Sequence, residues 1–225
     1  MPRAVPTAPA AIAVSACLAA AAHAEFIVPA LTVRAVNAFV ANPGVGQDSD
    51  SASTTGVETF TESVFASAPG GGRIGSASAS QNSRFEPDRI VFTGGGTLAE
   101  TPAGGPEITT RFKSDGLMVF TLTEPTDYLL FGVSSNAGVD LRISDGANNT
   151  VLETRTIPSE SIRLEGSLAP GTYGLFFGMN AGGDEDPSSN ESFTFAASYS
   201  FQFIVPAPMT AAPLFGLIAL QRRRR

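Results

Sequence analysis

Acidic side chains are the residues of this sequence whose type and spacing could do chemistry. Asp184, Glu185 and Asp186 lie together in NAGGDEDPSSNES, and Asp48 and Asp50 lie two positions apart in GQDSDS. Carboxylate oxygens are the preferred ligands of Ca²⁺, which takes about six to eight oxygens. The first group is therefore a candidate Ca²⁺ site. A solvated acidic loop between two strands is the simpler alternative, since neither stretch has the glycine and glutamate spacing of an EF-hand loop.

The N-terminal stretch has the pattern of an export signal. One early positive charge, Arg3, precedes an apolar run, and the run ends in a triplet with small residues at its first and third positions, Ala22 and Ala24. This pattern predicts a signal peptide over residues 1–24, removed by signal peptidase. The alternatives are a buried alanine-rich helix and lipidation at Cys17, although the apolar run after Cys17 is unlike a lipoprotein tether.

Cleavage after Ala24 would exclude several kinds of catalysis. It would remove Cys17 and His23, which are the single cysteine and the single histidine of the chain. The mature protein would then have no disulfide, no Ser-His-Asp triad and no zinc site of the usual Cys/His kind. Carboxylate, Ser/Lys or Tyr chemistry would remain, with Lys113 as the single lysine. Glycosidase chemistry, for example, would need a pair of carboxylates in a cleft, and the sequence alone does not show which acids converge.

Charge excludes one class of partner. The formal net charge is -7, and without Arg3 and the final Arg222, Arg223, Arg224 and Arg225 the chain keeps nine basic residues against 21 acidic ones. A nucleic-acid partner is not expected, because no basic patch is present to neutralise phosphates.

These groups must be positioned by strands, because period-two alternation dominates the chain. Every odd position from Phe193 to Val205 is apolar or aromatic, while most even positions are polar. Such alternation predicts a strand with one buried face, about 40 Å long, and that length favours a bend or bulge partway along it. The same alternation recurs at 139–143, 162–168 and 173–177, and DGANN, which follows the first of these runs, predicts a turn. Two denser runs, GLMVFTLTE and YLLFGVSS, are predicted to be strands buried on both faces.

The repeated strand pattern predicts an all-β, antiparallel sandwich of jelly-roll-like type. Residues 25–101 form a Ser/Ala/Gly-rich β region, and residues 102–205 form the sandwich domain. Alternating Ala and Ser in GSASASQNS favours strands at an edge or over a thin layer, with a flexible linker as the alternative. The segment PAGGPE at 102–107 is the expected join, and the sequence leaves open whether the two parts are one domain or two.

Residues 107–199 resemble the pre-peptidase C-terminal type of β-sandwich found on secreted bacterial proteins. The resemblance rests on MVFTLTEPTDYLLFGVSS, VDLRISDGANNTVLE and IRLEGSLAPGTYGLFF. It implies a small module that binds or stabilises and does not catalyse. Sugar-binding surfaces usually offer aromatic rings, but the chain has no Trp, and its three Tyr residues fit core or strand positions; these are Tyr128, Tyr173 and Tyr199.

The C-terminal stretch combines a short apolar run with a basic cluster. Ala207 to Leu220 would be about 21 Å long as a helix, shorter than a hydrocarbon core of about 30 Å. Pro208 and Pro213 interrupt a regular helix further. Arg222 to Arg225 would hold the end of the run on the cytoplasmic side. This predicts a short hydrophobic helix that anchors the protein transiently in the inner membrane.

The tail is similar to the PEP-CTERM sorting signal of Gram-negative bacteria. The motif here is Val205, Pro206, Ala207 and Pro208, followed by the apolar run and the terminal arginines. The resemblance implies processing within 206–225 by an exosortase-like membrane protease. Ala207 stands where the commonest form has Glu, and Pro213 is a second departure. A plain short anchor, or an apolar final strand with a basic end, is the alternative.

Together these features predict a non-catalytic exported protein of the cell surface or extracellular matrix. The expected partners are signal peptidase, an exosortase-like protease and an extracellular polysaccharide, and no cofactor is expected unless Ca²⁺ binds at the acidic loop. The alternatives are a polysaccharide- or Ca²⁺-binding module and a hydrolase that uses carboxylates alone.

Overall fold

The computed structural model describes residues 27–42, 44–70, 73–101, 108–184 and 192–205. They form twelve strands, β1 (Val28–Asn42), β2 (Gly46–Thr54), β3 (Phe60–Gly70), β4 (Arg73–Glu86), β5 (Arg89–Glu100), β6 (Thr109–Leu122), β7 (Thr126–Ser135), β8 (Val139–Asp145), β9 (Thr150–Arg155), β10 (Ser161–Leu168), β11 (Gly171–Asp184) and β12 (Phe193–Ile204). The described residues contain no helix, and so no helix among them could cross a membrane.

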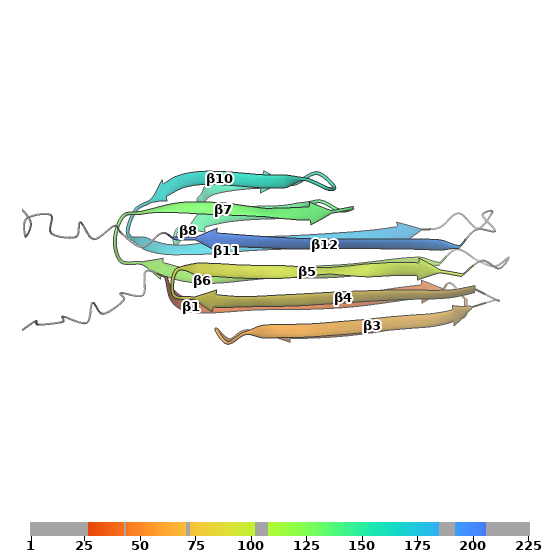
Figure 1. Ribbon diagram of the computed structural model, residues 1–225. Helices are drawn as coiled ribbons and strands as arrows, with labels where there is room; N and C mark the ends of the chain where they lie inside the picture. The colour runs from red at the N-terminus through yellow and green to blue at the C-terminus, as the bar shows by residue number, and fades with distance from the viewer. Residues whose placement is uncertain (1–26, 43, 71–72, 102–107, 185–191, 206–225) are drawn as a thin grey trace, which may run out of the picture.

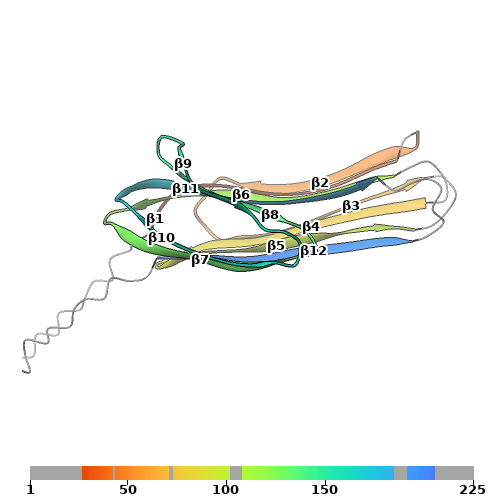
Figure 2. The same cartoon turned by 90° about the horizontal axis from the view of Figure 1, so that it is seen from above.

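Two antiparallel six-stranded sheets pack face to face (Figures 1 and 2). Sheet A has the order β2-β1-β6-β11-β8-β9, and sheet B has the order β10-β7-β12-β5-β4-β3. The predicted all-β antiparallel sandwich is confirmed. The predicted signal peptide and C-terminal helix fall on residues 1–24 and 206–225, which lie outside the described residues.

Strands from both parts of the chain share both sheets. β1 pairs with β6 over most of its length in sheet A, and β5 pairs with β12 in sheet B. Residues 25–101 and 102–205 therefore contribute to one sheet system, while the expected join at 102–107 lies outside the described residues.

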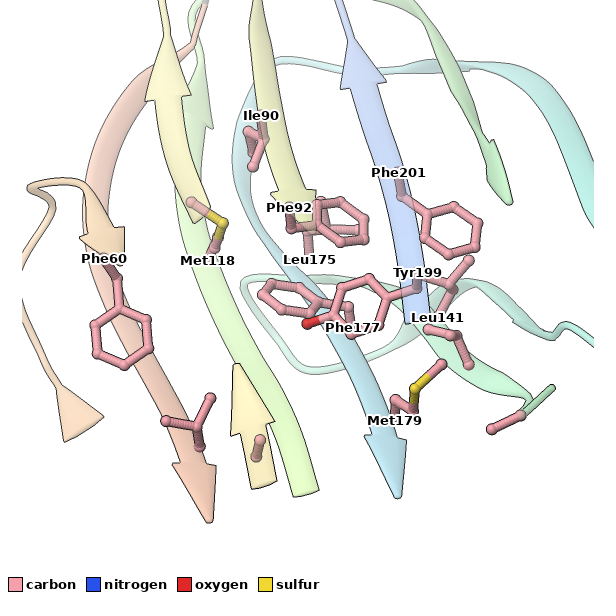
Figure 3. Packing of buried hydrophobic residues seen from close by; sticks show 14 of the residues in the cluster. Phe60, Ile90, Phe92, Met118, Leu141, Leu175, Phe177, Met179, Tyr199 and Phe201 are labelled. Carbon is pink, nitrogen blue, oxygen red and sulfur yellow. The ribbon is translucent and has the colours of Figure 1, made fainter. Parts of the chain in front are cut away.

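The core lies between the sheets, and buried side chains from strands of both sheets meet there (Figure 3). Phe92 of β5 in sheet B stacks on Phe177 of β11 in sheet A, with 4.4 Å between ring centroids, and lies 5.7 Å from Phe201 of β12. Such ring pairs contribute about 1 kcal/mol each beyond the area they bury. The three tyrosines are buried, as expected.

The strand predicted over 193–205 is confirmed, and it pairs with its neighbour without a bulge. Ala197, Tyr199, Phe201 and Phe203 are buried, whereas Ser198 on the opposite face is exposed. The register with β5 runs without a shift from Phe193 to Ile204, so the expected bulge is absent from this pairing. A partner of the same length on β5 lets the strand continue without one.

Burial of the two dense runs on both faces is a prediction that the structure overturns. β6 buries Met118 and Phe120 in the core, but its Leu117 and Val119 are half-buried on the outer face of sheet A. In β7, Val133 is 48% exposed. The reason is that neither sheet has a third layer of described residues over its outer face.

The alternation of Ala and Ser forms strands, as expected, and not a linker. β2 is an edge strand, and β4 lies one strand in from the edge. Ala77 and Ala79 of β4 are buried, and their small side chains let the two sheets approach closely there. The strands of small residues thus lie over a thin part of the core.

A hydroxyl pair also joins the two sheets. Tyr199 and Ser114 hydroxyls lie 2.8 Å apart, and Ser114 Oγ donates to the Ser80 carbonyl at 3.1 Å. A Cβ at Gly94 would lie within 2.8 Å of both hydroxyl oxygens, so this close approach requires glycine. Burial raises the pKa of the Tyr199 hydroxyl above its ordinary value, so this hydroxyl stays protonated and able to donate.

Candidate functional site

The two acids of β2 connect the two sheets along one side of the sandwich. Asp48 Oδ2 accepts a hydrogen bond from the amide of Ser67 at 2.8 Å, and Asp50 Oδ2 accepts one from the amide of Phe65 at 3.2 Å. Both amides belong to β3, the edge strand of sheet B, whose free N–H groups would otherwise face solvent. Asp48 and Asp50 are therefore held by the backbone of the neighbouring sheet.

The candidate Ca²⁺ group at the end of β11 is not assembled by the described residues. Asp184 is the last residue of β11 and pairs with Thr109 of β6, while Glu185 and Asp186 lie outside the described residues. Within the described ranges, no group of three or more His, Cys, Asp or Glu residues could hold a metal ion.

Asp145 organises the turn between β8 and β9. Its carboxylate accepts hydrogen bonds from the amides of Ala147 at 3.0 Å and Asn149 at 2.8 Å, and from the side-chain amide of Asn149 at 2.9 Å. These bonds, with that of the Asn149 side chain first, lower the pKa of the Asp145 carboxyl from its ordinary value. The turn predicted at DGANN is confirmed, and its acid is structural.

The first residue of the predicted sorting motif belongs to the fold. Val205 is fully buried, and its amide donates to the carbonyl of Asp88 at 2.8 Å. Pro206, Ala207, Pro208 and the cluster Arg222 to Arg225 lie outside the described residues, as do Ala22 and Ala24 at the predicted signal cleavage site.

A hollow on the outer face of sheet A brings charged groups and an aromatic ring together. Its volume is 510 Å³, and it lies over β8, β9 and β11. The residues that line it are Asp140, Leu141, Arg142, Glu153, Thr154, Arg155 and Phe176. Asp140, Arg142, Glu153 and Arg155 are exposed, so the hollow opens to solvent.

Arg142 lines this hollow and lies against its aromatic ring. Its guanidinium carbon lies 5.6 Å from the centroid of the Phe176 ring, which is the geometry of a cation–π contact. Arg142 stands opposite Glu153 in the register of β8 and β9. The adjacent pair is loose, with 3.5 Å between Arg155 Nε and Asp140 Oδ1, and both side chains are more than half exposed.

An apolar strip continues from the ring across sheet A. Phe176 of β11 pairs with Leu117 of β6, which pairs in turn with Val33 of β1. Val33 is 45% exposed, and Leu117 and Phe176 are half-buried. Leu31 and Val119 form the next row of the same strip and are paired with each other.

The outer face of sheet B has a second hollow, of 360 Å³, above the three glycines of β5. It is lined by hydroxyl, amide and small residues and by no charged group. Its hydroxyls bond to one another, with 2.7 Å between the oxygens of Ser78 and Thr97 and 2.9 Å between those of Ser135 and Ser198. Because these hydroxyls already have partners, this hollow above β5 offers a ligand fewer free groups than the hollow on sheet A.

The pairing of Arg142 with Phe176 was missed by sequence reasoning. Alternation in VDLRIS places Arg142 on the face opposite Leu141, and alternation in TYGLFF places Phe176 opposite Leu175. The signal for outward-facing side chains was therefore available. The register that sets the two side chains beside each other comes from the pairing of β8 with β11.

Comparison with known proteins gives no relative by sequence. No family model matches the chain, and no curated protein matches it. Solved structures with partial likeness include the enzymatically active domain of tailspike protein 4 from bacteriophage CBA120, at 10% identity, with 58% of this chain and 19% of that chain covered and a TM-score of 0.24.

A second structure is the GH31 alpha-xylosidase of Xanthomonas citri, at 10% identity, with 74% of this chain and 32% of that chain covered and a TM-score of 0.23. The chain spans at most about a third of the length of these two structures. TM-scores this low give no support to an assignment of fold family or function.

Proposed function

We propose that this chain is a non-catalytic exported protein of the cell surface or extracellular matrix. In this proposal signal peptidase acts after Ala24, and an exosortase-like protease acts within the tail that follows Val205. One observation carries the proposal. All twelve described strands lie between the two predicted processing regions, with buried residues, Ile27 and Val205, at the two limits of the described part.

Processing at both ends would therefore leave the described fold complete. Cleavage after Ala24 removes no strand residue, because β1 begins at Val28. Cleavage beyond Val205 removes none either, since β12 ends at Ile204. A sorting signal outside a finished sandwich can be read and removed at no cost to the packing of the core.

The engagement of the acids supports a non-catalytic role. Asp48, Asp50, Asp145 and Glu160 accept hydrogen bonds from backbone amides. Other acids form ion pairs with arginine or lysine, namely Glu86, Asp88, Asp115, Asp140 and Glu165.

The pKa shifts of three carboxyl groups also support a non-catalytic role. A carboxyl that serves as a general acid needs a raised pKa. A hydrogen bond from its own backbone amide lowers the pKa of Glu58. The hydrogen bond from Arg89 lowers the pKa of Asp88, and that from the Asn149 side chain lowers the pKa of Asp145. Each of these acids is thus held as a carboxylate, which suits a structural or electrostatic role.

The experiment is intact-mass analysis of the protein from membrane and medium fractions of its host, with and without the processing protease. The expected mature chain begins at Glu25 and lacks the residues after about Val205. A matched variant with Arg222 to Arg225 changed to Ala should lose that C-terminal processing and keep the N-terminal one. A chain that retains an intact Arg222 to Arg225 cluster in the membrane of wild-type cells would overturn the sorting proposal.

A second candidate function, binding of a polysaccharide, is favoured by the hollow on sheet A. An aromatic ring, a guanidinium and an open apolar strip on one sheet face are groups that bind sugars. Binding and surface display are compatible, because the sorted protein could hold its ligand once outside the cell.

A further inference from the structure

We propose that the outer face of sheet A binds a carboxylated polysaccharide, whose carboxylate is held by Arg142 and whose sugar rings lie along the apolar strip. The inference rests on the proposed surface or matrix role and specifies the chemical class of the ligand. It follows from three properties of the face, which are a free guanidinium fork, a cleared aromatic ring and a mixed charge pattern.

The donors of Arg142 are oriented but unused. Within the described part of the chain its one recorded contact is the Phe176 ring, and it has no ion pair and no hydrogen bond there. Packing on a ring fixes a guanidinium without occupying its N–H groups. A planar fork of N–H donors held in this way matches the two oxygens of a carboxylate.

Glycines clear the space around the ring. Gly174 and Gly178 flank Phe176 on the outer face of β11. A Cβ at Gly178 would lie 3.1 Å from Cζ of Phe176, and a Cβ at Gly174 would lie 3.0 Å from Cδ1 of Leu117. Because neither position has a Cβ, the Phe176 ring and the Leu117 side chain can lie close over the sheet. The row of Phe176, Leu117 and Val33 is then a low surface on which a flat ligand can lie. The C–H faces of pyranose rings suit such a surface.

The charge pattern favours spaced carboxylates over a nucleic acid. The hollow contains two arginines, Arg142 and Arg155, together with Asp140 and Glu153. A phosphate backbone carries closely spaced charges and needs a row of basic side chains. A uronate polymer instead presents one carboxylate per sugar with apolar ring faces between. Arg155 can join the ligand too, because its exposed pair with Asp140 contributes little.

The test is isothermal titration calorimetry of the full-length chain with polygalacturonate, with its fully methyl-esterified form as the matched uncharged ligand. We expect binding of polygalacturonate and at least about a tenfold weaker binding of the ester, because esterification removes the partner of the guanidinium. Both titrations contain EDTA, so that a Ca²⁺ bridge between acidic protein and acidic polymer cannot account for the result.

Two variants assign the binding to this face. Arg142→Gln should weaken binding about tenfold or more. Arg163→Gln, which makes the same change of charge, should alter it less than about twofold, because Arg163 lies on β10 of sheet B, paired with Glu165. Arg142→Lys keeps the charge but loses the fork, and it should bind more weakly than wild type.

Several results would overturn the proposal. These are absence of binding by wild type, equal binding of acid and ester, equal effects of Arg142→Gln and Arg163→Gln, and stronger Arg142-dependent binding of single-stranded DNA or anionic vesicles. Far-UV circular dichroism checks that each variant is folded. The titration tests the ligand, and the intact-mass analysis tests export and sorting. A negative result in one does not change the result of the other, so the two proposals are tested separately.

Discussion

Arg34 is a charged side chain inside the core, and its contacts account for its position. It is fully buried, with Nη1 donating to the Ser83 carbonyl at 3.0 Å and Nη2 donating to the carbonyls of Gly56 at 2.8 Å and Glu58 at 2.6 Å. The ring of Phe60 lies 5.5 Å from its guanidinium carbon. Burial lowers the pKa of Arg34, and the charge of Glu58 opposes that shift. One side chain thus connects β1 of sheet A, β4 of sheet B and the segment between β2 and β3.

We expect Arg34→Met to lower the free energy of unfolding by about 3 kcal/mol. The substitution fills similar volume but leaves the carbonyls of Ser83, Gly56 and Glu58 without their donor, and that of Ser83 is in a buried residue. Arg84→Met is the control, because Arg84 forms a partly exposed surface pair with Glu86, at 2.7 Å, and its loss should cost no more than about 1 kcal/mol. Urea unfolding followed by far-UV circular dichroism measures both, and equal losses would show that the Arg34 contacts do not stabilise the fold.

At the scale of elements, β2 and β3 form a seam between the two sheets. Each is an edge strand paired on one side only. Because an unpaired edge is a template for association with another chain, native proteins cover it. Here the carboxylates of Asp48 and Asp50 reach from β2 to the amides of Phe65 and Ser67 on β3. A polar strand of small residues therefore protects its neighbour through side-chain bonds to the backbone.

Replacing Asp48 and Asp50 together by Ala should cause concentration-dependent self-association, because it frees two amides beside the exposed ring of Phe65. Light scattering with size-exclusion chromatography measures this. The double Asp→Asn variant keeps an acceptor oxygen at each position and should associate less. If the Ala and Asn variants associate equally, the lost charge is responsible and the amide bonds are not.

At the scale of the whole molecule, no boundary divides the described sandwich. β1 is held between β2 and β6, and β5 is held between β12 and β4, so each sheet needs strands from both parts of the chain. The buried cluster likewise runs from Ile27 to Val205. Neither part could fold alone without exposing the inner face and the paired edge of the other.

We therefore expect one cooperative unfolding transition. The chain has no Trp, so Phe85→Trp on β4 gives a fluorescence signal from the first part alone. The near-UV signal of Tyr128, Tyr173 and Tyr199 reports on the second part. Coincident midpoints in urea are the expected result. A fluorescence transition at clearly lower urea than the tyrosine transition would show two independent units.

The sequence was sufficient for the class of fold, because alternation is local. Phe193 to Val205 and the turn at Asp145 could be predicted from neighbouring residues alone. Sheet order and register could not, since they depend on pairings between distant strands, such as β1 with β6. The same limit hid the function of Asp48 and Asp50, the burial of Arg34 and the contact of Arg142 with Phe176. In each case the partner lies on another strand.

The start of β1 and the end of β12 lie at the same end of the sandwich and in different sheets (Figure 1). This placement makes the response to force depend on where the force is applied. Tension between the start of β1 and the end of β12 would pull sheet A away from sheet B and break the contacts between them one after another. Tension between that end and the opposite tips of the strands would run along the strands, where the hydrogen bonds lie crosswise and share the load. A chain tethered by that one end and pulled at the other would therefore be mechanically strong.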